Sequence, residues 1–398
     1  IMVLFSLLFI NKNMKNIILL IFVVLALMSC SRVDESDWTI LIYMAADNGL
    51  DQEALDDIED MMQAEFSDNI NVIVQVDFSE SNPQPEATYR YQIYPGLQEQ
   101  ISYLGEIDSG DQNELTSFAN WGFNKFPSEK QALVIWSHGN GWYEHFCQDI
   151  ESDDYISIAN GELRNGIKNI NEYLEILIFD ACNMQTVEVA AEITDYTDYI
   201  IASEGGVNSA GFPYAEIFSK WEEQTNVENI ALEIGFQYHK FYWDQGIYPF
   251  SCSLLKTSQF PQLLDKLTEF TSQWTINASE EIFIESRQNC LEFNDGGYNN
   301  LDMDVDIKEF FTNVYDNTEI DSLKTISEEI LIAIESSYVF QKTDEYPTGY
   351  PSDDVGAAII WFPDAEAQYY FDARKEEYLQ LQFSTTNWQN FLENSFTN

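Results

Sequence analysis

One histidine and one cysteine in this chain each follow closely on an apolar run that predicts a buried strand. The runs are residues 132–136 and 174–179, and they lead to His138 and Cys182. In a parallel α/β sheet the carboxyl ends of the strands share one edge, and chemistry takes place at that edge. The chain has only three histidines and five cysteines. We therefore interpret His138 and Cys182 as candidates for a nucleophile and its base.

The chemistry of such a pair depends on the thiolate, because the thiolate and not the thiol is the nucleophile. Cys182 is predicted to lie just before a helix that starts near Met184, whose N-terminus would lower the pKa of the thiol. His138 would act as general base for the thiol and as general acid for the leaving amine. The backbone N–H groups of Gly139 and Cys182 are the expected donors of an oxyanion hole.

Alternating strands and helices surround both candidate residues. Apolar runs bounded by turn residues predict the strands, and apolar stripes at helical spacing predict the helices. Repeated β–α alternation favours a mostly parallel sheet flanked by helices, which places the chain in the α/β class. The predicted strands are 38–45, 70–78, 132–136, 174–179 and 199–203, with a hairpin over 89–94 and 101–104. The predicted helices are 51–65, 112–125, 160–171 and 185–194.

The pattern changes after residue 246, where helices outnumber strands. Strands are predicted over 250–255 and 357–362, and helices over 258–275, 303–315, 319–339, 365–378 and 386–395. No linker rich in Pro, Gly or Ser separates this part from the rest. We therefore divide the chain into a core over 38–255 and a helical part with a late strand over 256–398. We expect the helical part to pack on the same sheet.

The chain is strongly acidic, with 68 Asp and Glu against 18 Lys and Arg and a net charge of −50. Such a charge repels nucleic acid, so nucleic-acid partners are excluded, and it favours cationic substrates or counter-ions. No C-x-x-C pair occurs, so neither a zinc ribbon nor a thioredoxin-like site is expected. Cys182 and Cys252 fall at or in predicted strands, and a chain of this length needs no disulfide staples, so we expect no disulfides.

Residues 1–30 carry the pattern of a bacterial targeting segment. A short basic stretch around Lys15 precedes the apolar run 17–28, which is too short to cross a membrane as a helix. Leu27-Met28-Ser29-Cys30 then resembles a lipobox, in which Cys30 receives a lipid and becomes the first residue. Residues 31–37 would be a polar tether. The protein would be anchored by its lipid in the bacterial cell envelope, on the periplasmic or the surface-facing side of the outer membrane. An uncleaved signal anchor is the alternative.

Several segments together resemble the clostripain family of cysteine peptidases, relatives of caspases, gingipains and legumain. The resemblance covers about residues 38–395 and implies a caspase-like fold. It also implies a cysteine endopeptidase that hydrolyses peptide bonds through a thioester, with His138 and Cys182 as its catalytic dyad. The segments similar to the family are 38–48, the histidine segment 132–142, the nucleophile segment 180–184, and the later strands 199–204 and 357–363.

The same resemblance assigns a substrate pocket. The family generally cleaves after Arg or Lys with carboxylates lining the pocket, and Asp180 matches one such position. Asp180 would otherwise cap a turn. Ser203 and Glu204 belong to the loop expected to contact the substrate, and Glu204 is the only acid in that loop, so a second pocket carboxylate is missing there or displaced. Residues 143–163 contain no Lys or Arg, so we expect the enzyme to work as one uncut chain.

The predicted chemistry requires no cofactor, and no set of metal ligands is assigned. Residues 302–306 resemble the start of a calcium loop, but Ile307 and Asn313 occupy the positions where an EF-hand needs Gly and Glu. We interpret this segment as a helix cap with acidic residues at the helix start. Some members of the clostripain family use calcium, so the resemblance leaves calcium binding to the acidic surface open.

A second interpretation is that the protein has the peptidase fold but is not catalytic. The chain would then be a surface lipoprotein that binds peptide or protein without cleaving it. Of the two other histidines, His145 lies close behind the histidine segment and could be mistaken for the base, and His239 is expected to pack within an aromatic helix.

Overall fold

The computed structural model describes residues 36–79, 87–143, 146–224, 226–277, 280–293, 304–344, 357–363 and 368–396. The predictions for the targeting segment, for Cys30 and for His145 lie outside the described residues. Ser36 and Asp37, predicted to end the tether, belong to the first strand instead, because Ser36 pairs with Ser128. None of the described helices is long and apolar enough to span a membrane.

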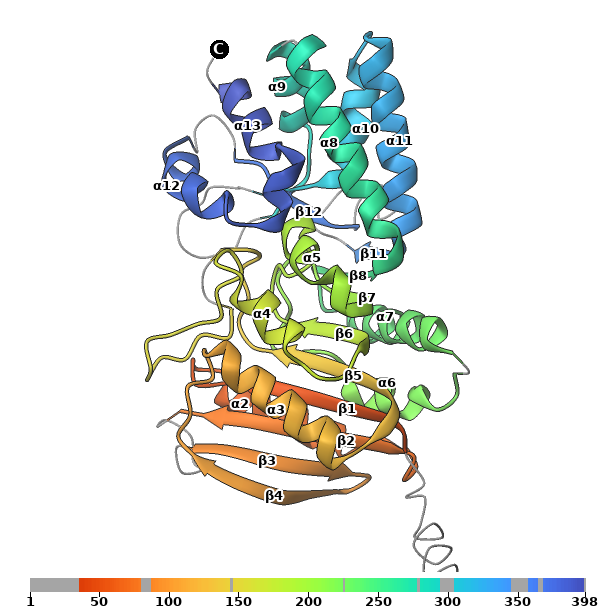
Figure 1. The fold of residues 1–398 in the computed structure, drawn as a ribbon. Coiled ribbons are helices and arrows are strands. Elements are labelled where there is room, and N and C mark those ends of the chain that lie inside the picture. Colours follow the sequence, from red (N-terminus) through yellow and green to blue (C-terminus); the bar gives the residue numbers. More distant parts are fainter. Residues whose placement is uncertain are drawn as a thin grey trace, which may run out of the picture.

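A nine-stranded sheet forms the centre of the molecule, in the order β11-β8-β7-β6-β5-β1-β2-β3-β4 (Figure 1). The five inner strands β7, β6, β5, β1 and β2 run parallel to one another. The outer strands join antiparallel on both sides, so the sheet is parallel at its centre, as predicted. The strands are β1 (Ser36–Ala45), β2 (Ile70–Phe78), β3 (Ala87–Tyr94), β4 (Leu97–Gly105), β5 (Ser128–Trp136), β6 (Leu174–Asp180), β7 (Thr197–Ala202), β8 (Phe250–Lys256) and β11 (Tyr338–Asp344).

Helices cover both faces of this sheet because successive side chains of each strand point to opposite faces. Leu41 and Tyr43 of β1 share one apolar cluster with Phe118 of α3. Ile40 and Ile42 fall in a second cluster, on the other face. The first cluster includes α3 (Gln112–Lys125), α4 (Glu162–Lys168) and α5 (Val187–Ile193); the second includes α2 (Asp51–Met61), α6 (Tyr214–Trp221) and α7 (Val227–Gln245).

The C-terminal part packs on the same sheet, as predicted, because β11 pairs with β8. Its helices gather beyond that edge, at the top of Figure 1. The predicted late strand is β12 (Ile359–Trp361), but it lies in a separate antiparallel sheet with β10 (Asp304–Asp306) and β9 (Glu292–Phe293). The helices are α8 (Phe260–Asn277), α9 (Glu280–Gln288), α10 (Ile307–Asn317), α11 (Asp321–Ser337), α12 (Gln368–Tyr378) and α13 (Trp388–Phe396).

The acidic segment before α10 caps that helix. The Asp306 carboxylate accepts a hydrogen bond from the Glu309 N–H at 2.8 Å, which confirms the interpretation of this segment as a helix cap. The helix predicted from residue 303 begins at Ile307, because residues 304–306 pair as a strand.

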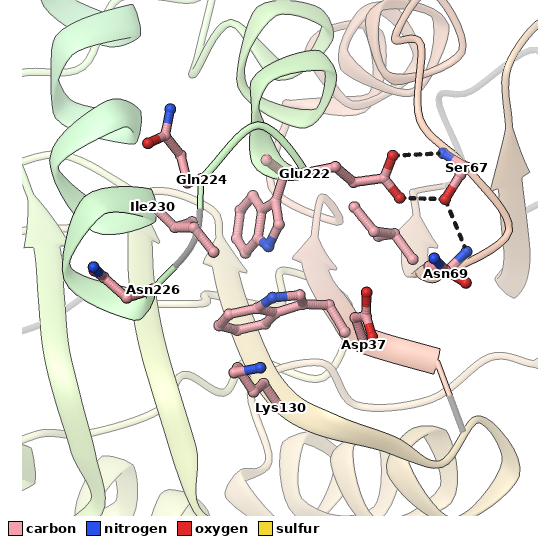
Figure 2. A pocket seen from close by; sticks show the side chains of 11 residues that line it. Asp37, Ser67, Asn69, Lys130, Glu222, Gln224, Asn226 and Ile230 are labelled. Carbon is pink, nitrogen blue, oxygen red and sulfur yellow. Dashed lines mark hydrogen bonds between the residues drawn. The ribbon is translucent and has the colours of Figure 1, made fainter. Parts of the chain in front are cut away.

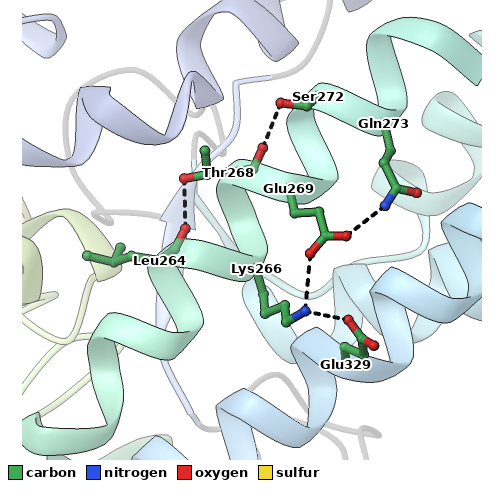
Figure 3. A network of polar contacts seen from close by, with 7 residues as sticks. All are labelled: Leu264, Lys266, Thr268, Glu269, Ser272, Gln273 and Glu329. Carbon is green, nitrogen blue, oxygen red and sulfur yellow. Dashed lines mark hydrogen bonds and ion pairs between the residues drawn. The ribbon is translucent and has the colours of Figure 1, made fainter.

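Helices α8 and α11 lie against each other and are joined by an ion pair at their surface (Figure 3). Lys266 of α8 lies 2.6 Å from Glu329 of α11 and 3.1 Å from Glu269 of its own helix. Both carboxylates are close to half exposed to solvent, so the pairs add little stability. The buried apolar residues Leu267 and Ile330 belong to the cluster that holds this part of the molecule together.

Candidate active site

The turns that carry His138 and Cys182 lie side by side at the carboxyl edge of the sheet. β5 and β6 are parallel neighbours whose last residues, Trp136 and Asp180, pair with each other. His138 and Cys182 therefore each lie two residues beyond this last pair of the two strands. A Cβ atom on Gly139 would lie 2.6 Å from the Cys182 carbonyl oxygen, so the backbones of the two turns are in direct contact and only glycine fits there.

The side chains of Asn48 and Ser137 hold the histidine turn in place by hydrogen bonds. Asn48 donates one amide hydrogen bond to Ser137 Oγ at 3.0 Å and another to the Ala45 carbonyl oxygen at 2.9 Å. The Ser137 hydroxyl also donates to the Ala45 carbonyl, at 2.8 Å. Ser137 is buried whereas His138 is exposed, so the anchor fixes the backbone and leaves the imidazole at the surface.

The cysteine turn is bound to the loop that follows β7. Asn183 has a left-handed backbone, with φ of 59°, and donates its N–H to the Gly205 carbonyl oxygen at 2.9 Å. The Gln185 N–H donates to the Ser203 carbonyl oxygen at 2.9 Å. The Val207 N–H donates to Cys182 Sγ at 3.2 Å, so the loop lies against the thiol.

The prediction that a helix begins next to Cys182 is wrong. Helix α5 starts at Val187 and is capped by the Thr186 side chain, which accepts from the Val189 N–H at 2.9 Å. The chain before it is extended because the Gln185 carbonyl accepts a hydrogen bond from the Ile359 N–H at 3.0 Å, next to β12 of the C-terminal part. The effect of a helix terminus fades within one turn, and four residues separate Cys182 from Val187.

The expected lowering of the thiol pKa is not found in this conformation. Burial raises the pKa of Cys182 above its usual value, and the charge of Asp180 raises it further. The hydrogen bond from the Val207 N–H acts in the opposite direction but does not outweigh burial. The thiol is therefore protonated at neutral pH while the loop covers it.

Asp180 lies beneath this site and is 4% exposed. Its Oδ2 accepts hydrogen bonds from the Tyr214 hydroxyl at 2.7 Å and from the Phe212 N–H at 3.1 Å. Burial raises the pKa of Asp180 to about 6 even though both hydrogen bonds oppose the shift. The expected pocket carboxylate is thus closed off from solvent in this conformation.

A second carboxylate, which the sequence analysis missed, accompanies Asp180. Asp57 of α2 is also 4% exposed and accepts a hydrogen bond from Trp136 Nε1 at 2.7 Å. A Cβ atom on Gly211 would lie 2.8 Å from an Asp57 oxygen and 3.2 Å from an Asp180 oxygen, so both carboxylates lie against this glycine. Burial raises the pKa of Asp57 well above its usual range, and the charge of Asp180 adds to that effect. The only signal in the sequence is that Asp57 interrupts the buried stripe of α2 beside Ile58.

Ser203 and Glu204 are buried in this conformation, with exposures of 1% and 0%. Ser203 Oγ lies 2.9 Å from Ser251 Oγ, and the Glu204 N–H donates to the same hydroxyl at 3.1 Å. Both residues therefore hold the base of the covering loop. Neither side chain is accessible in this conformation, so their contact with a substrate stays a prediction.

The remaining predictions about cysteine and histidine concern packing. The four cysteines of the described residues, Cys147, Cys182, Cys252 and Cys290, are all free, which agrees with the expected absence of disulfides. The His239 ring stacks on the Trp243 ring with centroids 6.1 Å apart, so it packs in an aromatic helix as expected.

Comparison with known proteins now decides the family. The model of the clostripain family, Peptidase_C11, matches residues 42–396. The chain belongs to the clostripain family. Clostripain from Hathewaya histolytica is 28% identical over 221 residues, which are 46% of this chain and 41% of that protein. The chain therefore aligns with less than half of the length of this curated clostripain.

Two solved structures of C11 proteases share the fold. An inactive zymogen from Parabacteroides distasonis has a TM-score of 0.70 at 20% identity, covering 88% of this chain and 98% of the other. A secreted C11 cysteine protease from Bacteroides thetaiotaomicron, in complex with an irreversible peptide inhibitor, has a TM-score of 0.67 at 20% identity, covering 89% and 100%. These similarities confirm the predicted caspase-like α/β fold of the clostripain family.

A pocket of about 400 Å³ lies at the opposite edge of this clostripain-family sheet (Figure 2). Trp38 and Lys130, near the starts of β1 and β5, line it together with Trp221 and Glu222 of the α6 end. Glu222 accepts a hydrogen bond from the Ser67 N–H at 3.2 Å. Since the strands begin here and the candidate residues lie where they end, this pocket is separate from the site of His138 and Cys182.

Proposed function

We propose that the chain is a cysteine endopeptidase that uses Cys182 as nucleophile and His138 as general base and acid. The observation that carries this proposal is the contact between the two turns, in which the Gly139 backbone lies against the Cys182 carbonyl. Membership of the clostripain family supports the same assignment. Proteins or peptides would be the substrates.

The proposed reaction passes through a thioester. His138 takes the thiol proton, and Cys182 Sγ attacks the carbonyl carbon of the scissile peptide bond. The amine leaves with the proton from His138, and a water molecule then hydrolyses the thioester and regenerates the thiol. The N–H groups of Gly139 and Cys182 are the proposed donors to the oxyanion, each worth a few kcal/mol of barrier (about 3).

The structure has the closed form of this site, because the Val207 N–H is bonded to Cys182 Sγ. We propose that substrate displaces the loop over residues 205–211. Its displacement removes the burial that raises the pKa of Cys182 and gives the thiol access to His138. Loop closure of this kind is a common way to control access to an active site.

The preference for Arg or Lys before the cleaved bond would come from Asp180 and Asp57 together. Two carboxylates against one glycine form a site whose charge a guanidinium or ammonium group would neutralise. Asp57 thus supplies the second pocket carboxylate that is missing from the loop after Ser203. A basic side chain would enter where Gly211 and Phe212 now close the pair.

A mixed-sequence peptide library tests the proposal. We expect cleavage concentrated after Arg and Lys, lost in Cys182→Ala and retained in Cys290→Ala, whose cysteine is buried far along the chain in the C-terminal part. Cleavage that persists in Cys182→Ala would refute the assignment of the nucleophile. Cleavage after other residues would agree with the dyad of His138 and Cys182 but refute the proposed role of Asp180 and Asp57 in specificity.

The second candidate function is peptide binding without turnover. It is favoured by one observation, the covered thiol with its raised pKa. Under this alternative, wild type and Cys182→Ala would bind the same peptides with equal affinity in a calorimeter, and neither would release cleaved products.

The lipid anchor at Cys30 is also a proposal, resting on the sequence of residues 27–30. Wild type would fractionate with the outer membrane of a bacterial host and carry an acyl mass on its N-terminal peptide. Cys30→Ser would lose both properties. A wild-type protein found without lipid in the soluble fraction would contradict this proposal.

A further inference from the structure

An aromatic side chain fills the space beside the two buried carboxylates. Phe212 follows the loop that covers the thiol and is 1% exposed. Its N–H donates to Asp180 Oδ2 at 3.1 Å. Its ring lies 4.6 Å from the ring of Tyr238, centroid to centroid, with 49° between the two planes. One residue therefore meets a carboxylate with an N–H donor and an aromatic ring with a flat side chain.

Tyr238 belongs to helix α7 and not to the covering loop, so the movement of the loop leaves it in place. Its ring packs against Tyr242 in the next turn, at 4.6 Å, and against Phe250 of β8, at 6.4 Å. Burial raises the pKa of the Tyr238 hydroxyl, and the charges of Asp180 and Cys182 add to that shift, so this residue lies close to both. Displacement of the loop would uncover a fixed aromatic wall beside the proposed pocket.

The contacts that hold Phe212 in place are ones that a cation can replace. The Tyr242 hydroxyl donates to the Gly211 carbonyl oxygen at 2.8 Å, and the Phe212 N–H is one uncharged donor to Asp180. A guanidinium group supplies two parallel N–H donors and a full positive charge to a carboxylate. A basic side chain of the substrate can therefore compete with Phe212 for this position.

Arginine matches both surfaces that Phe212 meets, whereas lysine matches only one. A guanidinium group is planar and weakly hydrated, so its face stacks on an aromatic ring while its edge binds a carboxylate. The lysine ammonium is a compact, strongly hydrated charge that can reach the carboxylates but has no flat face to place on the ring. An aromatic wall next to a carboxylate pair therefore distinguishes the two basic side chains.

We propose that Tyr238 is a specificity-determining residue whose ring stacks on the arginine side chain before the cleaved bond, in the position that Phe212 occupies in the closed form. Phe212 is then an internal competitor of the substrate, and the pocket prefers Arg to Lys. This inference rests on the proposed function, because it assumes that Asp180 and Asp57 receive the basic side chain.

Two peptides that differ only in Arg or Lys before the cleaved bond test the proposal. We expect the wild type to have the higher kcat/KM for the Arg peptide. Tyr238→Leu should lower that value by about tenfold, with a much smaller loss for the Lys peptide. Tyr238→Phe retains the ring and should keep the wild-type ratio of the two values. The control Phe236→Leu removes an exposed aromatic side chain from the same helix and should keep that ratio as well.

Phe212→Leu is a second variant, which tests the competitor and leaves the wall intact. Leucine keeps an apolar side chain on Tyr238 but has no flat ring to stack on it. We expect kcat/KM to rise for both peptides, by about threefold, because the closed form loses an aromatic contact. The ratio between the Arg and Lys peptides should not change. This variant and the wild-type ratio still test the proposal if Tyr238→Leu fails to fold.

Binding to the inactive Cys182→Ala variant separates this inference from the proposed catalysis. Calorimetry with the same two peptides should give the lower dissociation constant for the Arg peptide. Adding Tyr238→Leu to that variant should make the two constants nearly equal. These differences do not depend on turnover, so a protein that binds in this way without cleaving would refute the catalysis and support the role of Tyr238.

Three results would overturn the inference. They are a wild type that does not prefer Arg to Lys in cleavage or in binding, losses in Tyr238→Leu that are equal for the two peptides, and an unchanged kcat/KM in Phe212→Leu. Equal losses would mean that Tyr238 only supports the packing of α7, because a structural defect affects both peptides alike.

Discussion

Substituting Asp57 by Asn tests the paired carboxylates most sharply, because asparagine retains the shape and can still accept the hydrogen bond from Trp136. In the closed site, ionising Asp180 costs about 3 kcal/mol, since its pKa rises from 3.8 to about 6. A basic side chain of the substrate must offset that cost, and a second ionised carboxylate helps it to do so. For close, desolvated charge pairs the coupling is several kcal/mol, and we take about 3.

A loss of about 3 kcal/mol corresponds to a decrease of about a hundredfold in kcat/KM. We expect Asp57→Asn to lower kcat/KM by this factor for a peptide with Arg before the cleaved bond. A peptide that carries Gln at that position should be cleaved at an unchanged rate. The assay compares the two fluorogenic peptides with wild type, Asp57→Asn and the control Asp56→Asn, which removes an exposed acid from the same helix.

The pH dependence of the same assay provides a second criterion. Asp180 becomes protonated as the pH falls through about 6, so kcat/KM for the Arg peptide should decline there. Burial and the charge of Asp180 raise the pKa of Asp57 as well, and its carboxylate must be ionised to pair with the cation, so the wild type should gain activity as the pH rises and Asp57 loses its proton. Asp57→Asn should not show this increase in activity with rising pH. Equal losses for the Arg and Gln peptides, or no loss for either, would refute the paired pocket.

Three further predictions concern the surroundings of the site. Gly211→Ala should lower the free energy of unfolding by about 1–3 kcal/mol in urea, because φ is +57° and the new Cβ would meet an Asp57 oxygen at 2.8 Å. Gly206→Ala, with no atom within 4 Å, should change it by less than about 0.5 kcal/mol, and equal effects would contradict the argument. Glu188 has its pKa raised from 4.5 to about 8 by burial, so stability should fall as the pH rises from 4.5 through 8, by up to about 1.4 kcal/mol per pH unit. Thermal unfolding measured at pH 5 and pH 8 should show no such decline in stability for Glu188→Gln. A decline as steep as that of the wild type would refute the role of Glu188. Ser137→Ala should lower the free energy of unfolding by about 1 kcal/mol, because it removes the hydrogen bonds with Asn48 and the Ala45 carbonyl. It should also change kcat more than KM, since the backbone before His138 becomes looser. An unchanged kcat would contradict the role of these hydrogen bonds in positioning His138.

The strands around the site could be predicted because each is a mostly apolar run, interrupted only by Glu175 in the second. Residues 132–136 and 174–179 are buried on both faces of the sheet, and parallel neighbours place the residues after them at one edge. The position of His138 and Cys182 follows from that pattern. The helices on the faces were found where the apolar stripe is regular, as in α3, whose bounds agree with the prediction.

The start of α5 could not be predicted, because it depends on a partner far away in the sequence. The segment after Cys182 has helical propensity, but its backbone pairs with the chain at Ile359. Local pattern carries no information about such a contact. The C-terminal part therefore helps to shape the cysteine turn, which the sequence analysis did not foresee.

The acidic groups escaped prediction for a related reason. Asp57 approaches Asp180, and Asp77 approaches Asp149, only after the sheet has formed. In a chain with 68 acidic residues no single one is conspicuous. What distinguishes these residues is their burial, and burial of a charged group on an otherwise apolar strand or stripe is the signal to look for.

The central claim is that Cys182 attacks the substrate and that His138 activates it. Labelling with an irreversible peptidyl ketone that carries Lys before the reactive carbon, followed by mass spectrometry of the digested protein, tests this most directly. We expect one adduct, on Cys182, with labelling abolished in Cys182→Ala and strongly slowed in His138→Ala. An adduct on Cys147, Cys252 or Cys290, or labelling of Cys182 at the same rate without His138, would contradict it.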